Sequence, residues 1–249
     1  MRDGMNGSGV KLAIVAAMPR EIAGLAKHWE RISLEAQGRK FQAWKSVRAV
    51  AACCGTGAES AALVTKVAIE TFRPEMVTSV GFAGSLVPNL AAGSVIVPAR
   101  VVDGRSGREF RTAFGSGTLV TAADVVSGPA RQALASRYGA VAADMEATGV
   151  ARAAESAGLP FVAVKSVSDE FGTDVAFTSA FVRPERFQTG AFLAHVALRP
   201  WLWPAVAKLA RNTASAAEAL SSALQFWMED SEGFAARSES SAALPDRSQ

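Results

Sequence analysis

Two acidic residues follow two apolar runs within one stretch of this chain. The run at 140–143 leads to Glu146, and the run at 161–167 leads to Asp169. The residues between them, 147–157, are good helix formers with apolar side chains at helical spacing. If the runs are parallel strands joined by that helix, both acids leave the sheet at the edge where open α/β sheets bind ligands. Two side chains able to exchange protons there predict a ligand site.

A third acidic residue, Glu21, also follows an apolar run, at 10–17. Pro19 suits the first position of a helix, whose buried stripe we expect at 22–29. An acid in the first turn of a helix can be a simple cap or a solvated residue, because it favours the positive end of the helix dipole. Three acids in comparable places favour a shared site over three separate caps.

Two glycine-rich turns follow other predicted strands. Gly55, Thr56 and Gly57 separate a strand at 49–54 from a helix that runs to about residue 72. Such a turn presents backbone N–H groups to an anion or a polar ligand. The strand at 75–82 ends in the small residues of Gly81–Ser85, which would let a ligand approach the backbone.

The remaining pattern alternates strands and helices, which predicts one α/β domain. The expected sheet is mixed, mostly parallel, and covered by helices on both faces. Pro98 indicates an edge or a bulge in its strand, and the polar segment that follows that strand reads as a hairpin-like loop. The further strands are expected at 41–47, 94–102 and 118–121, the loop at 103–117, and the further helices after 128–129, at 189–198 and at 205–228.

The composition is that of a soluble protein with a sizeable core, since 49% of the 249 residues are hydrophobic and 20% are charged. The net charge of +3 and the lack of a Lys/Arg run argue against nucleic-acid binding. There is no apolar run of about 18 residues and no signal-peptide segment. We therefore expect a cytoplasmic protein with a disordered segment at 1–9, one folded domain at 10–229 and a disordered tail at 230–249.

The residues that usually hold metals or form disulfides are few. Cys53 and Cys54 are adjacent, which makes buried reduced thiols the expected state. His28 and His195 are the only histidines, too isolated for a histidine-ligated metal centre. The sequence predicts neither a metal nor a cofactor.

Three segments together resemble the nucleoside phosphorylase superfamily. They are AIVAAMPREI, TSVGFAGSLVPNLAAGSVIVP and ADMEATGVA…GLPFVAVKSVSDE, and the resemblance covers most of residues 10–228. It is greatest to the bacterial methylthioadenosine/S-adenosylhomocysteine nucleosidases. It implies a single α/β domain whose mixed sheet curls into a partial barrel, and a homodimer that cleaves a purine nucleoside in methionine salvage.

The resemblance also implies roles for the three acids. Asp169 would protonate purine N7, because a purine anion leaves the ribose poorly. Glu146 would accept hydrogen bonds from the ribose hydroxyls and stabilise positive charge on the sugar. Glu21 would activate the attacking water. The other implied site residues are Met145 under the sugar, Ala83 and Gly84 beside it, Ser168 supporting Asp169, and Val125 and Val126 at the purine.

Whether water or phosphate attacks stays open at this level. Phosphorylases of the superfamily place an arginine in the first strand–helix turn and a serine or threonine in the later glycine turn, and Glu21 and Phe82 stand there in this chain. A carboxylate beside a phosphate dianion is repulsive, which favours water. Arg20 could still reach a phosphate if the turn shifts by one residue, with Gly55, Thr56 and Gly57 as further phosphate contacts.

Two departures from the nucleosidases suggest a different 5′ substituent. The loop at 103–117 is short for the segment that closes over the substrate, and Phe82 replaces a small polar residue beside the ribose. With the segment RPWLWPAVAKLARN, this resembles the hopanoid-associated phosphorylases. Trp201, Trp203, Lys208 and Arg211 would then contact a membrane surface, although we favour a core or dimer-interface location for the tryptophans. A nucleoside-binding relative without activity is the remaining alternative.

Overall fold

The computed structural model describes residues 10–183 and 186–241. The expected disordered segment at 1–9 lies outside the described residues. Towards the C-terminus, the helix expected at 205–228 is longer in the structure than in the prediction. This helix, α6, covers Trp203–Ser241. The tail expected from residue 230 therefore begins inside this helix, and only 242–249 lie outside the described residues.

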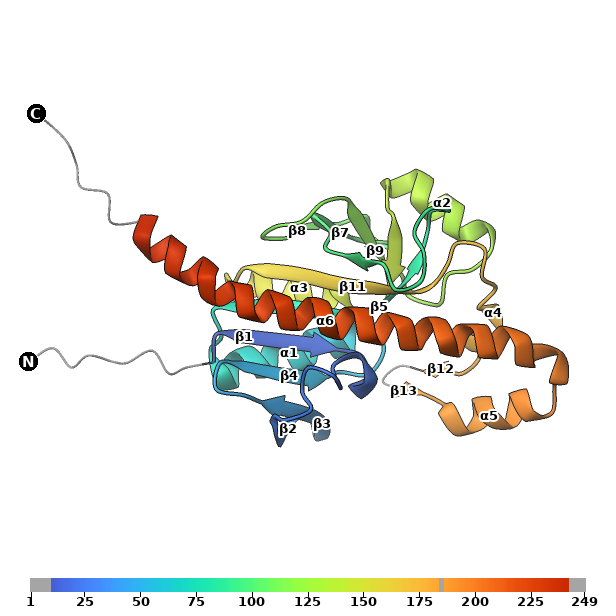
Figure 1. The fold of residues 1–249 in the computed structure, drawn as a ribbon, viewed down its shortest axis with the longest axis horizontal. Coiled ribbons are helices and arrows are strands. Elements are labelled where there is room, and N and C mark those ends of the chain that lie inside the picture. Colours follow the sequence, from blue (N-terminus) through green and yellow to red (C-terminus); the bar gives the residue numbers. More distant parts are fainter. Residues whose placement is uncertain (1–9, 184–185, 242–249) are drawn as a thin grey trace, which may run out of the picture.

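One mixed sheet forms the centre of the molecule (Figure 1). Its middle strand, β5, covers Met76–Ser85 and is parallel to β1 (Leu12–Ala16) and to β11 (Phe161–Asp169). No described pairing joins the two end strands, β2 and β8, so the sheet is not closed. The expected α/β class is confirmed. The strand order is β2-β3-β4-β1-β5-β10-β9-β7-β8, and β11 pairs with β5 and β6 outside that path. The other strands are β2 (Glu30–Ala36), β3 (Arg39–Lys45), β4 (Ala49–Cys53), β6 (Val95–Ile96), β7 (Arg100–Asp103), β8 (Glu109–Arg111), β9 (Thr118–Thr121) and β10 (Ala142–Asp144).

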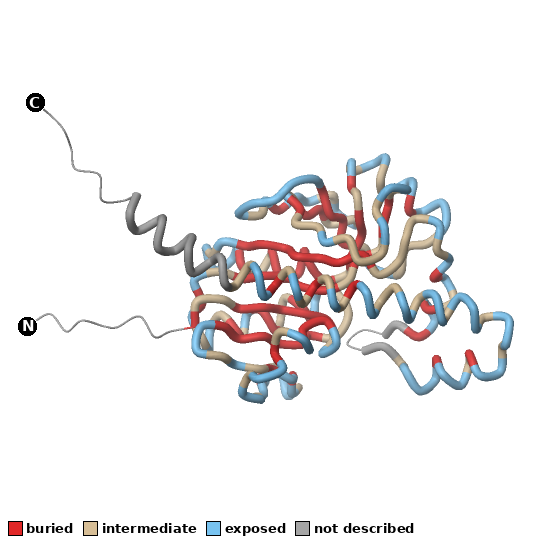
Figure 2. Tube along the Cα trace, viewed as in Figure 1, coloured by how far each residue is buried: buried red, intermediate tan, exposed pale blue. Residues whose placement is uncertain are grey.

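Alternation along the central strands builds a separate core on each face of the sheet. In β1, Ala13 and Val15 pack with helices α1 (Ala58–Phe72) and α3 (Ala147–Ser156). Ile14 and Ala16 point the other way and share a core with Leu220 and Leu224 of α6. A strand buried on both faces needs apolar residues at every position, which the sequence of β1 supplies. The α6 helix packs on one face of the sheet next to β11 (Figure 1). The central strands are buried between this helix and the helices of the other face (Figure 2).

The segment after β1 differs from the sequence-based expectation. The predicted helix with a stripe at 22–29 is only a 3-10 turn, η1 (Pro19–Glu21), followed by further turns. An unpredicted strand, β2, then pairs antiparallel with β3. The two residues between these strands, Gln37 and Gly38, both have positive φ, which is the two-residue hairpin turn that matches the twist of paired strands.

The strand expected at 94–102 is divided at Pro98 into β6 and β7, because proline cannot donate to the strand ladder. The hairpin-like loop is confirmed, since β7 pairs antiparallel with β8. A short helix after Gly128 is also confirmed as α2, which covers Pro129–Tyr138.

The direction of β10 corrects the argument from a parallel strand–helix–strand unit. β11 is parallel to β5, but β10 is antiparallel to it and lies on its other side. Glu146 and Asp169 therefore do not leave two parallel strands in the same direction. They approach each other because β10 and β11 both reach the carboxyl end of β5.

A helical extension follows β11. Its elements are α4 (Ala176–Ser179), β12 (Val182–Arg183), β13 (Arg186–Phe187), α5 (Thr189–Ala197) and η2 (Pro200–Leu202). Phe181, Phe192 and Val196 form a small core there. Trp201 and Trp203 are 71% and 55% exposed, so they do not lie in the core of the chain, and a dimer-interface location stays a prediction. Among the described residues, no helix combines the length and the apolar character needed to cross a bilayer.

Candidate active site

A cavity of about 430 Å³ lies at the carboxyl end of β5, between the sheet, α2 and α6. The structure brings most of the expected site residues to it from six segments of the chain. The expected residues that line the cavity are Arg20, Glu21, Thr56, Phe82, Ala83, Gly84, Val125, Val126, Met145, Glu146 and Asp169. Three expected residues, Gly55, Gly57 and Ser168, are not among the lining residues. Gly57 and Ser168 contact the acids instead, and Gly55 donates its N–H to Ala17 at 3.0 Å.

Gly84 is the position in β5 where the two later strands meet. It lies opposite Ala143 of β10 on one side and opposite Asp169 of β11 on the other. A Cβ atom on Gly84 would stand 2.7 Å from Oδ2 of Asp169. Only glycine leaves room for the carboxyl group at this point of the cavity.

Glu21 is held by backbone N–H groups from two turns. Its Oε2 accepts from Met18 at 2.8 Å, and its Oε1 accepts from Phe82 at 3.2 Å. The residue is only 3% exposed. Burial raises the pKa of Glu21, while the two N–H groups and the nearby charge of Lys165 oppose the rise. A buried carboxyl with a raised pKa is suited to accept a proton near neutral pH.

Glu146 closes the other side of the cavity. Its Oε1 accepts from the N–H of Gly57, at the start of α1, at 3.0 Å. The glycine turn expected to present N–H groups to a ligand thus gives one of them to a carboxylate of the protein. Burial and the neighbouring charge of Asp144 raise the pKa of Glu146 to about 8.

Lys165 is a site-forming residue that the sequence reasoning missed. It is completely buried in β11, and its Nζ lies 2.8 Å from Oδ2 of Asp144. Burial lowers the pKa of Lys165, but the charges of Asp144, Glu146 and Glu21 outweigh it and raise the pKa. The sequence did contain a signal for it, a lone lysine in the apolar run at 161–167. A lysine buried in a strand needs a carboxylate partner, so its presence there indicates a buried ion pair.

Asp144 fixes this buried pair in place. Its Oδ1 accepts from the hydroxyl of Thr121 at 2.7 Å, and its Oδ2 accepts from the N–H of Ala147 at 2.9 Å. The same carboxylate therefore binds the start of α3 and the ammonium group of Lys165. One buried cation stands among three buried carboxyl groups.

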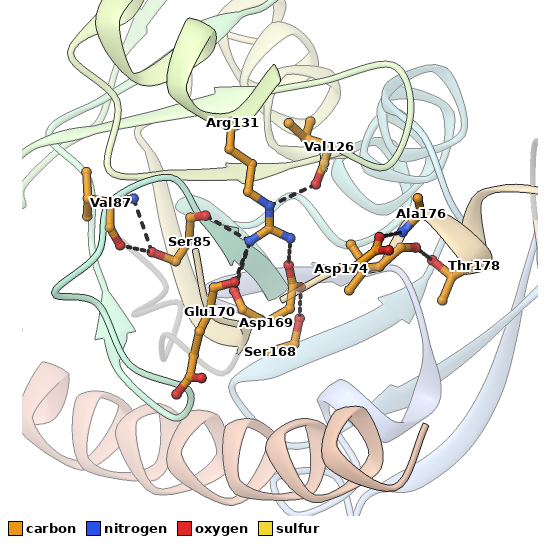
Figure 3. A network of polar contacts seen from close by, with 11 residues as sticks. Ser85, Val87, Val126, Arg131, Ser168, Asp169, Glu170, Asp174, Ala176 and Thr178 are labelled. Atoms are coloured by element: carbon orange, nitrogen blue, oxygen red, sulfur yellow. Dashed lines mark hydrogen bonds and ion pairs between the residues drawn. The ribbon is translucent and has the colours of Figure 1, made fainter. Parts of the chain in front are cut away.

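Asp169 is contacted by a second residue that the sequence reasoning missed, Arg131 (Figure 3). Arg131 lies in the first turn of α2, is 1% exposed, and pairs through Nη2 with Oδ2 of Asp169. The other carboxyl oxygen, Oδ1, accepts from the hydroxyl of Ser168 at 2.9 Å. No local pattern distinguished Arg131 from the other arginines, because its partner is far away in the sequence.

The far wall of the cavity is mostly apolar and comes from the helical extension and from α6. Its lining side chains are Thr178, Phe192, Val206, Leu209, Ala210 and Thr213. The short loop at 103–117 contributes no lining residue. Arg20 is exposed at the rim, where its guanidinium lies 5.4 Å from the ring centre of Phe82.

Metal ligands do not gather in the described residues, where no group of three or more His, Cys, Asp or Glu side chains could hold an ion. Cys53 and Cys54 are buried free thiols, and burial raises the pKa of both. Carboxyl groups and the guanidinium groups of Arg20 and Arg131 line the cavity, and Lys165 is buried next to Asp144, one of those carboxyl groups.

Known proteins with a similar sequence include members of one enzyme superfamily. The model of a family described as the phosphorylase superfamily matches residues 11–116 and 105–195. A relative from Shewanella sp. (strain W3-18-1), a 5′-methylthioadenosine/S-adenosylhomocysteine nucleosidase, is 27% identical over 219 residues, or 70% of this chain and 93% of the relative. The nucleosidase of the same name from Geobacillus thermodenitrificans (strain NG80-2) is 33% identical over 96 residues, 37% of this chain and 41% of that relative.

A solved structure has the same fold. The 5′-methylthioadenosine/S-adenosylhomocysteine nucleosidase from Helicobacter pylori with butyl-thio-DADMe-Immucillin-A superposes with a TM-score of 0.60 at 20% identity. The match covers 76% of this chain and 98% of that one.

Proposed function

Because this chain belongs to the phosphorylase superfamily, we propose that it is a purine nucleosidase that uses water to cleave the N-glycosidic bond of an adenine nucleoside. The observation that carries the proposal is the convergence of Glu21, Glu146 and Asp169 on one cavity. Its volume of about 430 Å³ lies within the range of small-molecule sites. The relatives named as nucleosidases support the same reaction.

Asp169 is proposed as the acid that protonates the leaving base. As the bond between C1′ and N9 breaks, its electron pair goes to the purine, and N7 takes the proton from the Asp169 carboxyl group. This makes the base a neutral leaving group and is worth about 10²-fold to 10⁴-fold in rate. Ser168 and Arg131 already fix both oxygens of this carboxyl group.

Glu146 and Met145 are proposed to hold the ribose. The hydroxyl groups of the sugar donate to the Glu146 carboxylate, and hydrogen bonds to the charged form favour that form. A carboxylate close to C1′ stabilises the positive charge that develops on the sugar. Met145, beside Glu146 in the cavity lining, packs under the sugar ring.

Glu21 is proposed as the base that takes a proton from the attacking water. Its two oxygens are aimed by the N–H groups of Met18 and Phe82. The ammonium group of Lys165 balances part of the negative charge around it. The water oxygen bonds to C1′, its proton goes to Glu21, and the products are free purine and free sugar.

The charges of the cavity favour water over phosphate as the nucleophile. Glu21, Asp144 and Glu146 line it, and Lys165 is the buried cation next to them. A phosphate dianion would enter next to these carboxyl groups and be repelled. Arg20 remains the candidate phosphate contact for the alternative, phosphorolytic reaction, because it lies at the rim.

The experiment is a product analysis. Purified protein is incubated with methylthioadenosine, S-adenosylhomocysteine, adenosine and inosine, each with and without phosphate. Without phosphate, we expect a free sugar together with the free base, which is adenine from the three adenine nucleosides. Sugar 1-phosphate formed only with phosphate would replace hydrolysis by phosphorolysis, and tight adenosine binding without base release would support a non-catalytic relative.

Variants assign the roles. Asp169→Asn and Glu21→Gln are expected to lower kcat by about 10²-fold or more, the usual worth of a proton-transfer group. Glu30→Gln, an exposed carboxyl on β2, is the matched control and keeps wild-type activity. Full activity of Asp169→Asn would remove this residue from the mechanism.

A substrate with an apolar 5′ substituent is the second candidate, and the far wall of the cavity favours it. Phe192, Val206 and Leu209 face the cavity at that side. A substituent larger than methylthio would bury apolar surface there, at about 25 cal/mol per Å². Comparing kcat/KM for adenosine and for 5′-alkylthio derivatives of increasing length tests this assignment.

The setting of the reaction is proposed as well. We place it in the cytoplasm and in methionine salvage, in keeping with the relatives that are named for methylthioadenosine. A groove along α1 and α3 shares Thr56, Asp124 and Met145 with the cavity. We propose that a second copy covers this groove in a homodimer, which light scattering of the purified protein would test.

A further inference from the structure

We propose that Arg131 is a positioning residue that aims the Asp169 carboxyl group at the leaving base. The inference rests on the proposed function, because it concerns how the acid of that reaction is held. Arg131 comes from α2, which contributes none of the three acids and was expected only as a helix after residues 128–129.

The guanidinium of Arg131 joins three separate parts of the cavity wall (Figure 3). Nη2 pairs with Oδ2 of Asp169. Nη1 donates to the carbonyl oxygen of Ser85, at the end of β5, at 3.0 Å, and to that of Glu170 at 2.8 Å. Nε donates to the carbonyl oxygen of Val126, in the loop before α2, at 3.1 Å. The planar fork of arginine is suited to hold several acceptors in one fixed arrangement.

This arrangement determines where the acid can be. Asp169 is the last residue of β11, where its ladder with β5 becomes irregular, so the strand pairing alone fixes it poorly. Arg131 binds its side chain and the next carbonyl group, and Ser168 binds the second carboxyl oxygen at 2.9 Å. On the far side, the Glu170 carboxylate pairs with Lys208 of α6 at 3.1 Å. The acid is thus held between α2 and α6.

The charge of Arg131 also fits the direction of proton transfer. When Asp169 gives its proton to N7, negative charge develops on the carboxyl group, and the adjacent guanidinium stabilises that charge. Arg131 itself neither gains nor loses a proton in the step.

The test compares two leaving groups. The purine of adenosine needs protonation, whereas 4-nitrophenolate from 4-nitrophenyl β-D-ribofuranoside leaves as a stable anion. We expect Arg131→Met to lower kcat for adenosine by about 10-fold to 100-fold, because a displacement of about 1 Å at an acid costs that much. The rate with the nitrophenyl riboside should change by less than about 3-fold, since the acid contributes little there. Asp169→Asn should show the same selective pattern.

The controls separate positioning from folding. Arg137→Met, an exposed residue of the same helix, should match the wild type with both substrates. If Arg131→Met fails to fold, Arg131→Lys keeps the charge without the fork and should show the same selectivity for adenosine. An equal loss with both substrates, or no loss with adenosine, would overturn the proposal. A wild-type protein that cleaves neither substrate would count against the proposed function instead.

Discussion

Replacing Gly84 by alanine adds one methyl group where the structure leaves no space. The new Cβ would lie 2.7 Å from Oδ2, 3.4 Å from Cγ and 3.5 Å from Oδ1 of Asp169. To reach ordinary van der Waals contact, the carboxyl group must retreat by about 0.7 Å. Gly84 has no positive φ, so the substitution brings no backbone strain of its own. The perturbation is therefore almost entirely a displacement of the proposed acid.

The expected result is a large loss of turnover with a small loss of stability. A shift of this size at a proton donor should lower kcat for adenosine by about 10-fold to 100-fold. The free energy of unfolding should fall by only about 1–3 kcal/mol, the usual cost of overpacking. The assay follows adenine release at saturating adenosine, with urea unfolding of the same samples.

Gly172→Ala is the matched control. A Cβ at Gly172 meets nothing within 4 Å, and the same chemical change should leave turnover and stability as in the wild type. If Gly84→Ala keeps wild-type kcat, Asp169 does not act from the position that the structure gives it. The assignment of the acid would then be refuted, whatever the stability of the variant.

Three further predictions concern the buried charges and the apolar wall. Lys165→Met should lower the free energy of unfolding at pH 8 by about 3–5 kcal/mol, because Asp144 loses its buried partner. Urea unfolding measures this change, and Lys11→Met, which removes an exposed ion pair, is the control. An equal effect of the two substitutions would contradict the prediction. The pKa of Glu146 is raised from 4.5 to about 8, so between these pH values the folded protein holds a proton that the unfolded chain has lost. This proton stabilises the folded state fully below pH 4.5, and the stabilisation is lost as the pH rises towards 8. The Tm of Glu146→Gln should therefore change less than that of the wild type between pH 5 and pH 8, and parallel curves would show that the carboxyl group is not buried as described. Phe192→Ala should raise KM for a 5′-alkylthio adenosine by about 10-fold and leave KM for adenosine unchanged, since it removes apolar contact only from the 5′ substituent. A rise of KM for both substrates would place Phe192 elsewhere in the site.

Apolar runs in the sequence were sufficient to predict the central strands. A strand such as β1, buried on both faces, must be continuously apolar, and β9 was expected at the residues where it is found. The three acids could be predicted for a related reason. Each directly follows such a run, and the glycine-rich end of β5 marks where a ligand can approach the backbone.

Other features depended on contacts between distant residues. The apolar run at 140–143 predicts a strand but not its direction, and β10 pairs antiparallel with β5 and parallel with β9. The segment at 22–29 has helix-like spacing, but the structure forms turns there, and the hairpin of β2 and β3 begins directly after them. Local spacing carries no information about such competing partners.

The fold class, the central strands and the acids of the candidate site could be predicted from the order of residues along the chain. The cations that accompany those acids became apparent only in the folded molecule. Lys165 stands out in its apolar run and Arg131 does not stand out in its helix, but for both residues the partner, Asp144 or Asp169, lies in another strand. The physical reason is that a buried charge is tolerated only next to its counter-charge, and the neighbours of a side chain exist only after the chain has folded.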